Sequence, residues 1–294
     1  MKYNTCIVAF IDILGFKEMV FKSGKDEDKH QMISKALSYL KNLEKNHDWV
    51  KKFIAVEEDA QKIGEEKFII DKLMRVTCFS DSILISVRLE EKENRFNEVF
   101  STLVAYIAFV GNFLIKNGIL IRGGITVGDL VHTREGVVYG RGLIKAHELE
   151  SKTAINPRII LSKELIKKLN YPLESKRYRY PYHQYLSRFS DGCLGFHQLT
   201  ILQVMDSLEE EMFIEMFEED KETIVDKIKN VIIGELDNNF EKTEVFSKYD
   251  WLKEEFNRLI LPSNPEREKI ELINENFNIY YERQNYNKSK KENN

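Results

Sequence analysis

The first apolar run of the chain stops at an acidic residue. Residues 5–11 (TCIVAFI) are rich in β-branched and aromatic side chains, which is typical of a buried strand, and Asp12 and Gly15 follow them. The pattern predicts a buried strand that enters a turn, with a carboxylate at its end. Within 30–53, apolar residues recur every three or four positions and predict an amphipathic helix. Such a helix needs a sheet to lie on, so we expect a sheet around the first strand.

A second acidic residue lies at the turn of a predicted hairpin. Two runs of strand-forming residues, 73–79 and 83–89, flank the polar triplet Ser80-Asp81-Ser82. The hairpin would place Asp81 at or beside its turn. If this hairpin and the first strand are neighbours in one sheet, the carboxylates of Asp12 and Asp81 meet at one sheet edge.

The remaining elements alternate irregularly. Helices are predicted over 96–114, 143–149 and 163–169, and strands over 119–126, 137–139 and 158–161. A last strand pair or one long strand is predicted over 193–204. This order differs from the regular βαβ alternation of a doubly wound fold and predicts an α+β sheet with helices packed on it, in a domain that spans 1–206. A helical C-terminal extension is expected over 207–286, with helices at 224–236, 251–260 and 267–283, and a disordered tail over 287–294.

Composition and charge narrow the function classes. The 44 basic and 48 acidic residues give a formal net charge of −4, which argues against a dedicated binder of nucleic acid or of an anionic membrane. Three cysteines without a CxxC pair argue against a disulfide framework or a thiolate zinc site, and the N-terminal apolar run is too short for a signal peptide. We therefore expect a cytoplasmic protein with no membrane partner and no specific nucleic-acid partner.

One segment keeps an interaction with RNA open. Residues 176–188 (KRYRYPYHQYLSR) combine cations with tyrosines, a combination that stacks on and neutralises single-stranded nucleic acid. Given the overall negative charge, we favour an aromatic-rich connection that packs on its own domain or on a dimer partner.

The two acids suit a divalent-metal site. Two hard oxygen ligands side by side fit Mg²⁺ or Mn²⁺, and a metal pair serves in-line displacement at phosphorus. Gly15 adds a turn at which backbone N–H groups could face a phosphate. Simpler interpretations stay open for each residue alone: Asp12 as a helix cap, Asp81 as a turn residue, and Gly15 as part of a plain strand-to-helix turn.

Five segments of the sequence resemble the catalytic domain of class III nucleotidyl cyclases. They are AFIDILGF (9–16), CFSDSILIS (78–86), IRGGITVGDL (121–130), VVYGRGLIKAHELE (137–150) and RIILSKEL (158–165). The sequence is most similar to the bacterial pyrimidine cyclases of the Pycsar antiphage system, which convert UTP or CTP to a cyclic mononucleotide that triggers an effector. The resemblance implies a ferredoxin-like palm sheet and covers about the first two thirds of the chain.

The resemblance assigns roles to individual residues. Asp12 and Asp81 match the two metal-binding aspartates, and Ile13 matches the position whose backbone carbonyl binds the second of two Mn²⁺ or Mg²⁺ ions. Leu14, Gly15 and Phe16 match the turn that holds the triphosphate. The family's active site forms between two protomers, so the resemblance implies a homodimer. It favours UTP as substrate and cyclic UMP as product, with a cytidylate cyclase that converts CTP as the alternative.

The sequence departs from purine cyclases at four aligned positions. Thr77 and Val137 stand where a lysine and an acid read the purine base. Ile144 and Glu148 stand where an asparagine and an arginine orient the ribose and stabilise the transition state. An ordinary adenylate or guanylate cyclase is therefore disfavoured, whereas a pyrimidine enzyme with a rearranged pocket and a catalytically inactive nucleotide sensor both stay open.

Several cations could replace the missing arginine. Arg141, predicted as catalytic, lies four residues before Lys145, and Arg75, Arg122 and Arg158 lie on or beside core strands, where each could reach a phosphate or be an ordinary structural cation. Glu148 and Glu150 receive no role. The full set of predicted substrate-binding residues is Phe10, Leu14, Gly15, Phe16, Thr77, Val137, Tyr139, Lys145 and Arg158.

Overall fold

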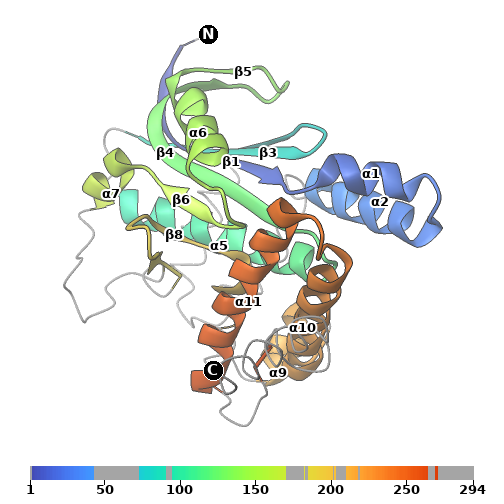
Figure 1. Cartoon of the computed structure of the whole chain (residues 1–294). Coiled ribbons are helices and arrows are strands. Elements are labelled where there is room, and N and C mark those ends of the chain that lie inside the picture. Colours follow the sequence, from blue (N-terminus) through green and yellow to red (C-terminus); the bar gives the residue numbers. More distant parts are fainter. Residues whose placement is uncertain are drawn as a thin grey trace, which may run out of the picture. The chain divides into compact units, whose positions relative to one another are not determined.

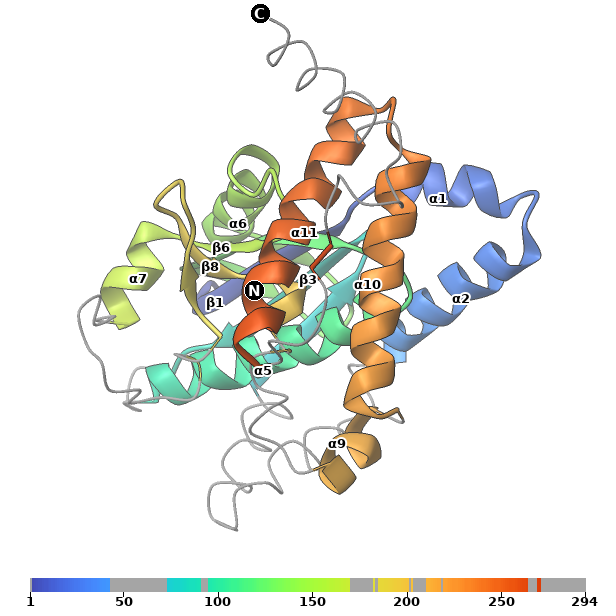
Figure 2. The ribbon, with the colours of Figure 1, turned by 60° about the horizontal axis from the view of Figure 1, so that its bottom comes forward.

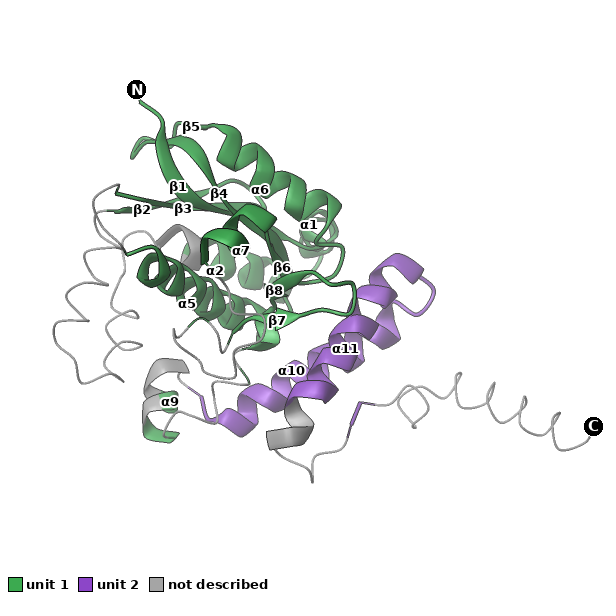
Figure 3. Cartoon of the chain, turned by 90° about the vertical axis from the view of Figure 1, so that its left-hand side faces the viewer, with its two compact units in different colours: residues 1–218 green, residues 219–294 purple. Residues whose placement is uncertain are grey.

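The computed structural model describes residues 2–42, 73–90, 95–169, 182, 185–200, 202, 210–217, 219–263 and 269–270. The chain divides into two compact units, residues 1–218 and 219–294 (Figure 3). The division falls after helix α9 (Glu210–Phe217), later than the boundary predicted at 206/207. The tail 287–294 and most of 176–188 and 267–283 lie outside the described residues.

Unit 1 is built on one mixed sheet. Its strands are β1 (Asn4–Ile13), β2 (Met74–Cys78), β3 (Ser82–Arg88), β4 (Ile121–His132), β5 (Val138–Tyr139), β6 (Ile159–Leu161), β7 (Ser187–Arg188) and β8 (Leu194–Phe196). The order is β2-β3-β1-β4-β6-β8-β7, and β5 pairs with β4. Every pairing is antiparallel except β4 with β6. The α+β prediction is confirmed, including the first strand next to the hairpin.

Helices cover both faces of this sheet, which explains why β1 is a continuous apolar run. Ile7, Ala9 and Ile11 pack into the larger core with helix α5 (Phe96–Ile115), whereas Cys6 and Val8 belong to a smaller cluster with helix α6 (Arg141–Lys152). In Figures 1 and 3, α6 lies across β1 and β4 on the face opposite α5. The shorter helices of unit 1 are α1 (Phe16–Ser23), α2 (Glu27–Asn42) and α7 (Lys163–Leu169).

Helix α5 is long and apolar enough to cross a membrane by length and composition alone. It is the core helix of unit 1, and 78% of its most apolar window is buried inside the protein. Figure 2 shows it running beneath the strands. Among the described residues no other helix has this composition, and a single buried helix of this kind is a weak indication of a membrane span.

The segment 193–204, predicted as a strand pair or one long strand, contributes β8 to the structure. After β8 the chain forms a 3₁₀ turn, η3 (Gln198–Thr200), and the Gln198 side chain is buried. Its Oε1 accepts from the Ile121 backbone N–H at 2.8 Å, and its Nε2 donates to the carbonyls of Gly111 and Ile119 at 2.9 Å. The buried amide thus satisfies backbone groups of α5 and of the start of β4.

Unit 2 contains helices α10 (Lys221–Asn238) and α11 (Thr243–Ser263), which include the predicted 224–236 and 251–260. Asp220 caps α10 by accepting from the Thr223 backbone N–H at 2.8 Å. Ile224, Ile228 and Ile232 recur every four residues and are fully buried.

Candidate functional site

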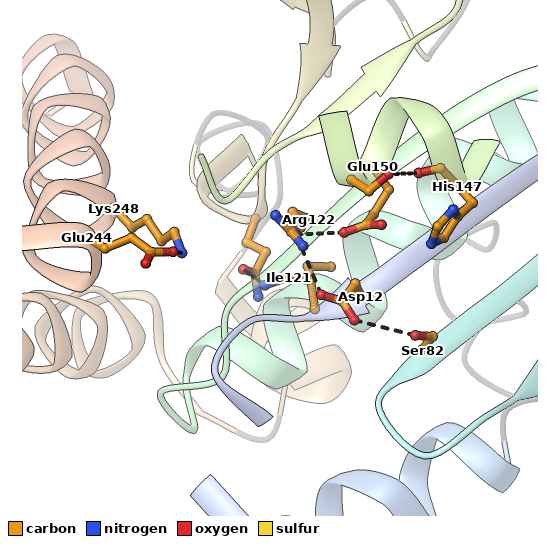
Figure 4. A network of polar contacts seen from close by, with 10 residues as sticks. Asp12, Ser82, Ile121, Arg122, His147, Glu150, Glu244 and Lys248 are labelled. Atoms are coloured by element: carbon orange, nitrogen blue, oxygen red, sulfur yellow. Dashed lines mark hydrogen bonds and ion pairs between the residues drawn. The ribbon is translucent and has the colours of Figure 1, made fainter. Parts of the chain in front are cut away.

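The structure places Asp12 and Asp81 at the same end of two neighbouring strands. β1 pairs with β3 so that Asp12 lies opposite Ser82, and the Ile13 backbone N–H donates to the Asp81 carbonyl at 2.8 Å. The Ser82 hydroxyl donates to Asp12 Oδ1 at 3.4 Å (Figure 4), and the Ser80 hydroxyl donates to Asp81 Oδ1 at 2.9 Å. The two acids therefore converge on one sheet edge, as the hairpin pattern predicts.

The surroundings of Asp12 do not fully stabilise the negative charge of its carboxylate. Burial raises the pKa of its carboxyl above the usual range, Arg122 opposes that rise, and the charge of Asp81 adds to it. A positive charge placed between the two carboxylates would relieve this repulsion.

Arg122, a candidate cation from the sequence, pairs with Glu150, to which the sequence assigned no role. Arg122 on β4 lies opposite Asp12, with its Nε 3.5 Å from Asp12 Oδ2 and 2.7 Å from Glu150 Oε1 (Figure 4). Burial raises the pKa of Glu150, Arg122 lowers it, and Asp12 raises it. A usable signal was the spacing on α6, where the buried residues are Gly142, Ala146 and then Glu150, so the acid falls on the sheet-facing side.

The donor set fits a hard divalent cation. The Asp12 and Asp81 carboxylates and the Ile13 backbone carbonyl are oxygen ligands of the kind Mg²⁺ and Mn²⁺ take, and Mg²⁺ commonly uses one or two carboxylates together with water and substrate phosphates. Within the described ranges no group of three His, Cys, Asp or Glu residues is arranged to hold a metal ion by itself. Such a site would therefore depend on ligands from the substrate.

The turn after β1 has the backbone expected from Gly15. Gly15 adopts a φ of 73°, in the left-handed region that favours glycine, and helix α1 begins at Phe16. The Leu14 backbone N–H donates to the Leu120 carbonyl at 2.9 Å, which ties the turn to the start of β4. Gly15 is exposed, and Leu14 and Phe16 are partly buried.

A hollow of about 530 Å³ lies between α6 and the strand ends. Its lining is mostly apolar and comprises Phe10, Phe79, Leu143, Ile144, His147, Glu148, Ser151 and Lys152. Phe10 precedes Asp12 by two residues on β1, and Phe79 precedes Asp81 by two residues in the turn between β2 and β3, so the hollow adjoins both acids. Its volume suits a small molecule or part of one. Ile144 and Glu148, the departures from the purine-cyclase pattern, both line it.

The structure keeps a second group of predicted residues apart from the acids. Arg141 and Lys145 are exposed in the first half of α6, whereas Glu150 lies near its end. Along the helix axis Arg141 is about 13 Å and Lys145 about 7.5 Å from Glu150. Val137, just before β5, and Tyr139, in β5, are exposed. The Tyr139 ring packs edge-on against Tyr3, with 5.7 Å between ring centroids. Within one protomer these side chains do not share a cluster with Asp12.

Thr77 is engaged with a histidine. Its hydroxyl lies 2.8 Å from His132 Nε2, and the Ser86 hydroxyl lies 2.8 Å from His132 Nδ1. Burial, with a smaller contribution from Arg75, lowers the pKa of His132 to about 4, so the imidazole is neutral at neutral pH. Both ring nitrogens therefore have hydroxyl partners, and Thr77 is held in a polar cluster of β2, β3 and β4.

Arg158 is a buried cation held by three groups. Its guanidinium pairs with Asp191 in the turn between β7 and β8, lies 3.4 Å from the Thr153 carbonyl, and stacks 4.9 Å from the centre of the Phe189 ring. The hydrogen bond from Arg158 lowers the pKa of Asp191. A phosphate contact for Arg158, proposed from the sequence, would have to displace these partners and stays a prediction.

No model of a known protein family matches the sequence, and no curated protein matches it. Several solved structures are similar in part. The monomeric guanylyl cyclase domain of the RhoGC fusion protein from Blastocladiella emersonii is 15% identical, with a TM-score of 0.38 over 57% of this chain and 86% of that one. The catalytic core of a rhodopsin-guanylyl cyclase with converted specificity, in complex with ATPαS, is 15% identical, with a TM-score of 0.37 over 66% and 93%.

A class III adenylyl cyclase-like ATP-binding protein from Pseudomonas aeruginosa is 12% identical, with a TM-score of 0.40 over 81% of this chain and 44% of that one. At these identities and TM-scores, no function passes from those proteins to this chain.

Proposed function

We propose that this protein is a metal-dependent nucleotide cyclase that converts a pyrimidine nucleoside triphosphate, UTP first, to its cyclic monophosphate and pyrophosphate. The observation that supports this most is the convergence of Asp12 and Asp81 at the ends of β1 and β3, with the Ile13 backbone between them. These residues belong to the segments AFIDILGF and CFSDSILIS, which resemble the metal-binding motifs of class III cyclases.

In the proposed reaction the 3′-hydroxyl oxygen attacks the α-phosphorus of the same nucleotide. The new ester bond forms as the bond to pyrophosphate breaks, and the hydroxyl proton passes to water. Two divalent cations held at Asp12 and Asp81 would supply positive charge for the triphosphate and lower the pKa of the hydroxyl. Asp12 and Asp81 hold this end of the site, Gly15 provides the turn beside the triphosphate, and Arg122 lies close enough to Asp12 to meet a phosphate.

The proposal requires a second protomer. Arg141 and Lys145 are exposed in the first half of α6, whereas Glu150, which pairs with Arg122 beside Asp12, lies near its end. A homodimer could place the start of one α6 opposite the acids of the other protomer. Arg141 is then the candidate for the missing transition-state arginine, and Lys145, Val137 and Tyr139 are candidate substrate contacts.

The substrate class rests on the departures from purine cyclases. Thr77, which replaces the base-reading lysine, carries a hydroxyl engaged with neutral His132 and offers no positive charge. Cytidylate cyclase activity on CTP is the alternative. By the same resemblance, the cyclic product would serve as a second messenger that triggers an effector in antiphage defence, and the protein would work in the cytoplasm.

The test is product formation. The full chain is incubated with Mn²⁺ and each of the four nucleoside triphosphates, and cyclic products and pyrophosphate are measured. We expect cyclic UMP, and no turnover with Asp12→Ala or Asp81→Ala, while the melting temperature of each variant stays unchanged or rises because repulsion between the two acids is removed. A folded dimer that forms no cyclic product would refute the proposal.

A catalytically inactive nucleotide sensor is the second candidate. It is favoured by Ile144 and Glu148, which line the hollow where the purine-cyclase pattern has an asparagine and an arginine. A sensor would gain thermal stability from nucleotide and Mn²⁺ without consuming the nucleotide, whereas the enzyme would consume it.

A further inference from the structure

Glu150 is a carboxylate at a core position of α6. The helix presents Gly142, Ala146 and Glu150 to the sheet, and the Glu150 side chain is only 4% exposed. A buried carboxylate is costly unless a cation accompanies it. Arg122 is that cation, 2.7 Å away, and Figure 4 shows its guanidinium between Glu150 and Asp12.

Gly124 lets Glu150 come this close. A Cβ on Gly124 would lie 2.5 Å from the Ala146 carbonyl oxygen and would also collide with Leu149. Gly124 lies opposite Phe10 in the sheet, two residues from the pair formed by Arg122 and Asp12. The bare backbone at Gly124 therefore brings the end of α6 down onto β4, where Glu150 meets Arg122.

Arg122 has one positive charge and two carboxylates beside it. Its Nε is 2.7 Å from Glu150 but 3.5 Å from Asp12, so the buried acid holds the shorter contact. If Glu150 did not hold the guanidinium, Arg122 could turn fully onto Asp12 and neutralise it. A divalent cation at Asp12 would then compete with a complete ion pair.

We propose that Glu150 is a positioning residue that holds Arg122 back from Asp12 and so keeps the Asp12 carboxylate available to a divalent cation. This inference rests on the proposed function, because it takes Asp12 and Asp81 as the metal ligands. It gives Glu150 a role through Arg122 and no direct contact with the metal.

The test measures Mn²⁺ affinity of the full chain without nucleotide, from the electron paramagnetic resonance signal of free Mn²⁺. Glu150→Gln is expected to weaken binding about tenfold, the scale of change caused by partners of metal ligands. Glu150→Asp keeps the negative charge but places it farther from Arg122, because the side chain is one methylene shorter. It is expected to weaken Mn²⁺ binding by a smaller factor. Glu148→Gln is the matched control: it removes the same charge from the same helix, but Glu148 pairs with exposed Lys152, and binding should stay within about twofold.

A second pair of variants separates action through Arg122 from direct coordination. In an Arg122→Met background, adding Glu150→Gln is expected to change Mn²⁺ affinity less than about twofold, because the group that Glu150 positions is gone. A tenfold loss in that background would overturn the proposal by identifying Glu150 as a ligand. Unchanged affinity in both Glu150→Gln and Glu150→Asp would also overturn it. If Glu150→Gln does not fold, Glu150→Asp and the Arg122→Met pair decide.

Asp12→Ala distinguishes this inference from the proposed function. If Asp12→Ala leaves Mn²⁺ binding unchanged, the metal site itself is wrong and both proposals fail. If Asp12→Ala abolishes binding while the Glu150 variants bind as the original chain does, only the role of Glu150 is refuted.

Discussion

Two arginines, on or beside neighbouring strands of the sheet, each form an ion pair with a carboxylate, but a different member of each pair is buried. In the pair of Arg158 with Asp191, the cation is the buried member, with side-chain exposures of 5% and 45%. In the pair of Arg122 with Glu150, the carboxylate is the buried member, with exposures of 24% and 4%. Both arginines could be candidates for phosphate binding from sequence alone, but the structure gives them different surroundings.

The two pairs differ in whether the buried member can become neutral by a change of protonation. A guanidinium stays protonated at any working pH, so Arg158 always needs its counter-ion. A carboxylate can take up a proton, and the raised pKa of Glu150 and the lowered pKa of Asp191 point in opposite directions. We infer that the Arg158 pair is a fixed structural contact, whereas the charges around Arg122 can respond to a bound cation.

The largest expected effect comes from removing the charge of Asp191. Asp191→Asn leaves Arg158 buried without a carboxylate and should cost about 3 kcal/mol of unfolding free energy. The Cys193 backbone N–H donates to Asp191 at 3.1 Å, and the amide oxygen that this substitution introduces could still accept that bond, so the loss reports the ion pair. Scanning calorimetry of the full chain measures it.

Arg158→Met is the comparison for that measurement. It releases Asp191 to water and should cost less than Asp191→Asn, because no charge is left buried. A larger loss in Arg158→Met would mean that packing against Phe189, and not the charge, carries the contribution of Arg158. The difference in unfolding free energy between Asp191→Asn and the original chain should also disappear as the pH falls through the lowered pKa of Asp191. Its carboxylate is then protonated in the folded protein.

A smaller effect is expected from Gly124→Ala, which moves Glu150 away from Arg122. The added Cβ pushes against the α6 backbone and should cost about 2 kcal/mol through overpacking. Mn²⁺ binding should weaken together with stability. Gly234→Ala in α10 is the control, since nothing lies within 4 Å of its added Cβ and alanine should stabilise that helix by about 0.5–1 kcal/mol. Unchanged melting of Gly124→Ala would contradict the close approach of α6.

The smallest effect on stability, about 1 kcal/mol of unfolding free energy, is expected from Arg122→Met at neutral pH. Glu150 loses its cation in this variant, but it can take up a proton and become neutral. Asp12 and Glu150 both have raised pKa values, so their contribution to stability is complete at acid pH and is lost as the pH rises through those values. The deficit of Arg122→Met should therefore be larger at pH 8 than at pH 5. A deficit that grows toward acid pH would contradict this assignment of charges.

Much of the fold was readable from local patterns. The strand before Asp12, the hairpin around Asp81 and the α5 helix follow from runs of β-branched residues and from helical periodicity, which depend only on near neighbours. Strand β7 has no sequence signal because two residues carry no period. The segment 193–204, predicted as a strand pair or one long strand, forms β8 and then the 3₁₀ turn η3, which a run of apolar residues does not distinguish from a strand. The approach of Asp12 to Asp81 could be predicted, but only on the assumption that their strands are neighbours.

Local patterns in the sequence suffice to predict the strand ends of the site, where two acids and a glycine turn follow or join apolar runs. Tertiary structure decided which charges meet. Arg122, Arg158 and Glu150 look alike in sequence as charged residues beside apolar ones, and their partners come from segments far along the chain. Ion pairing depends on the distance between the charges and on their burial, which are set by packing, for example where α6 packs against Gly124. A local sequence pattern does not contain that information.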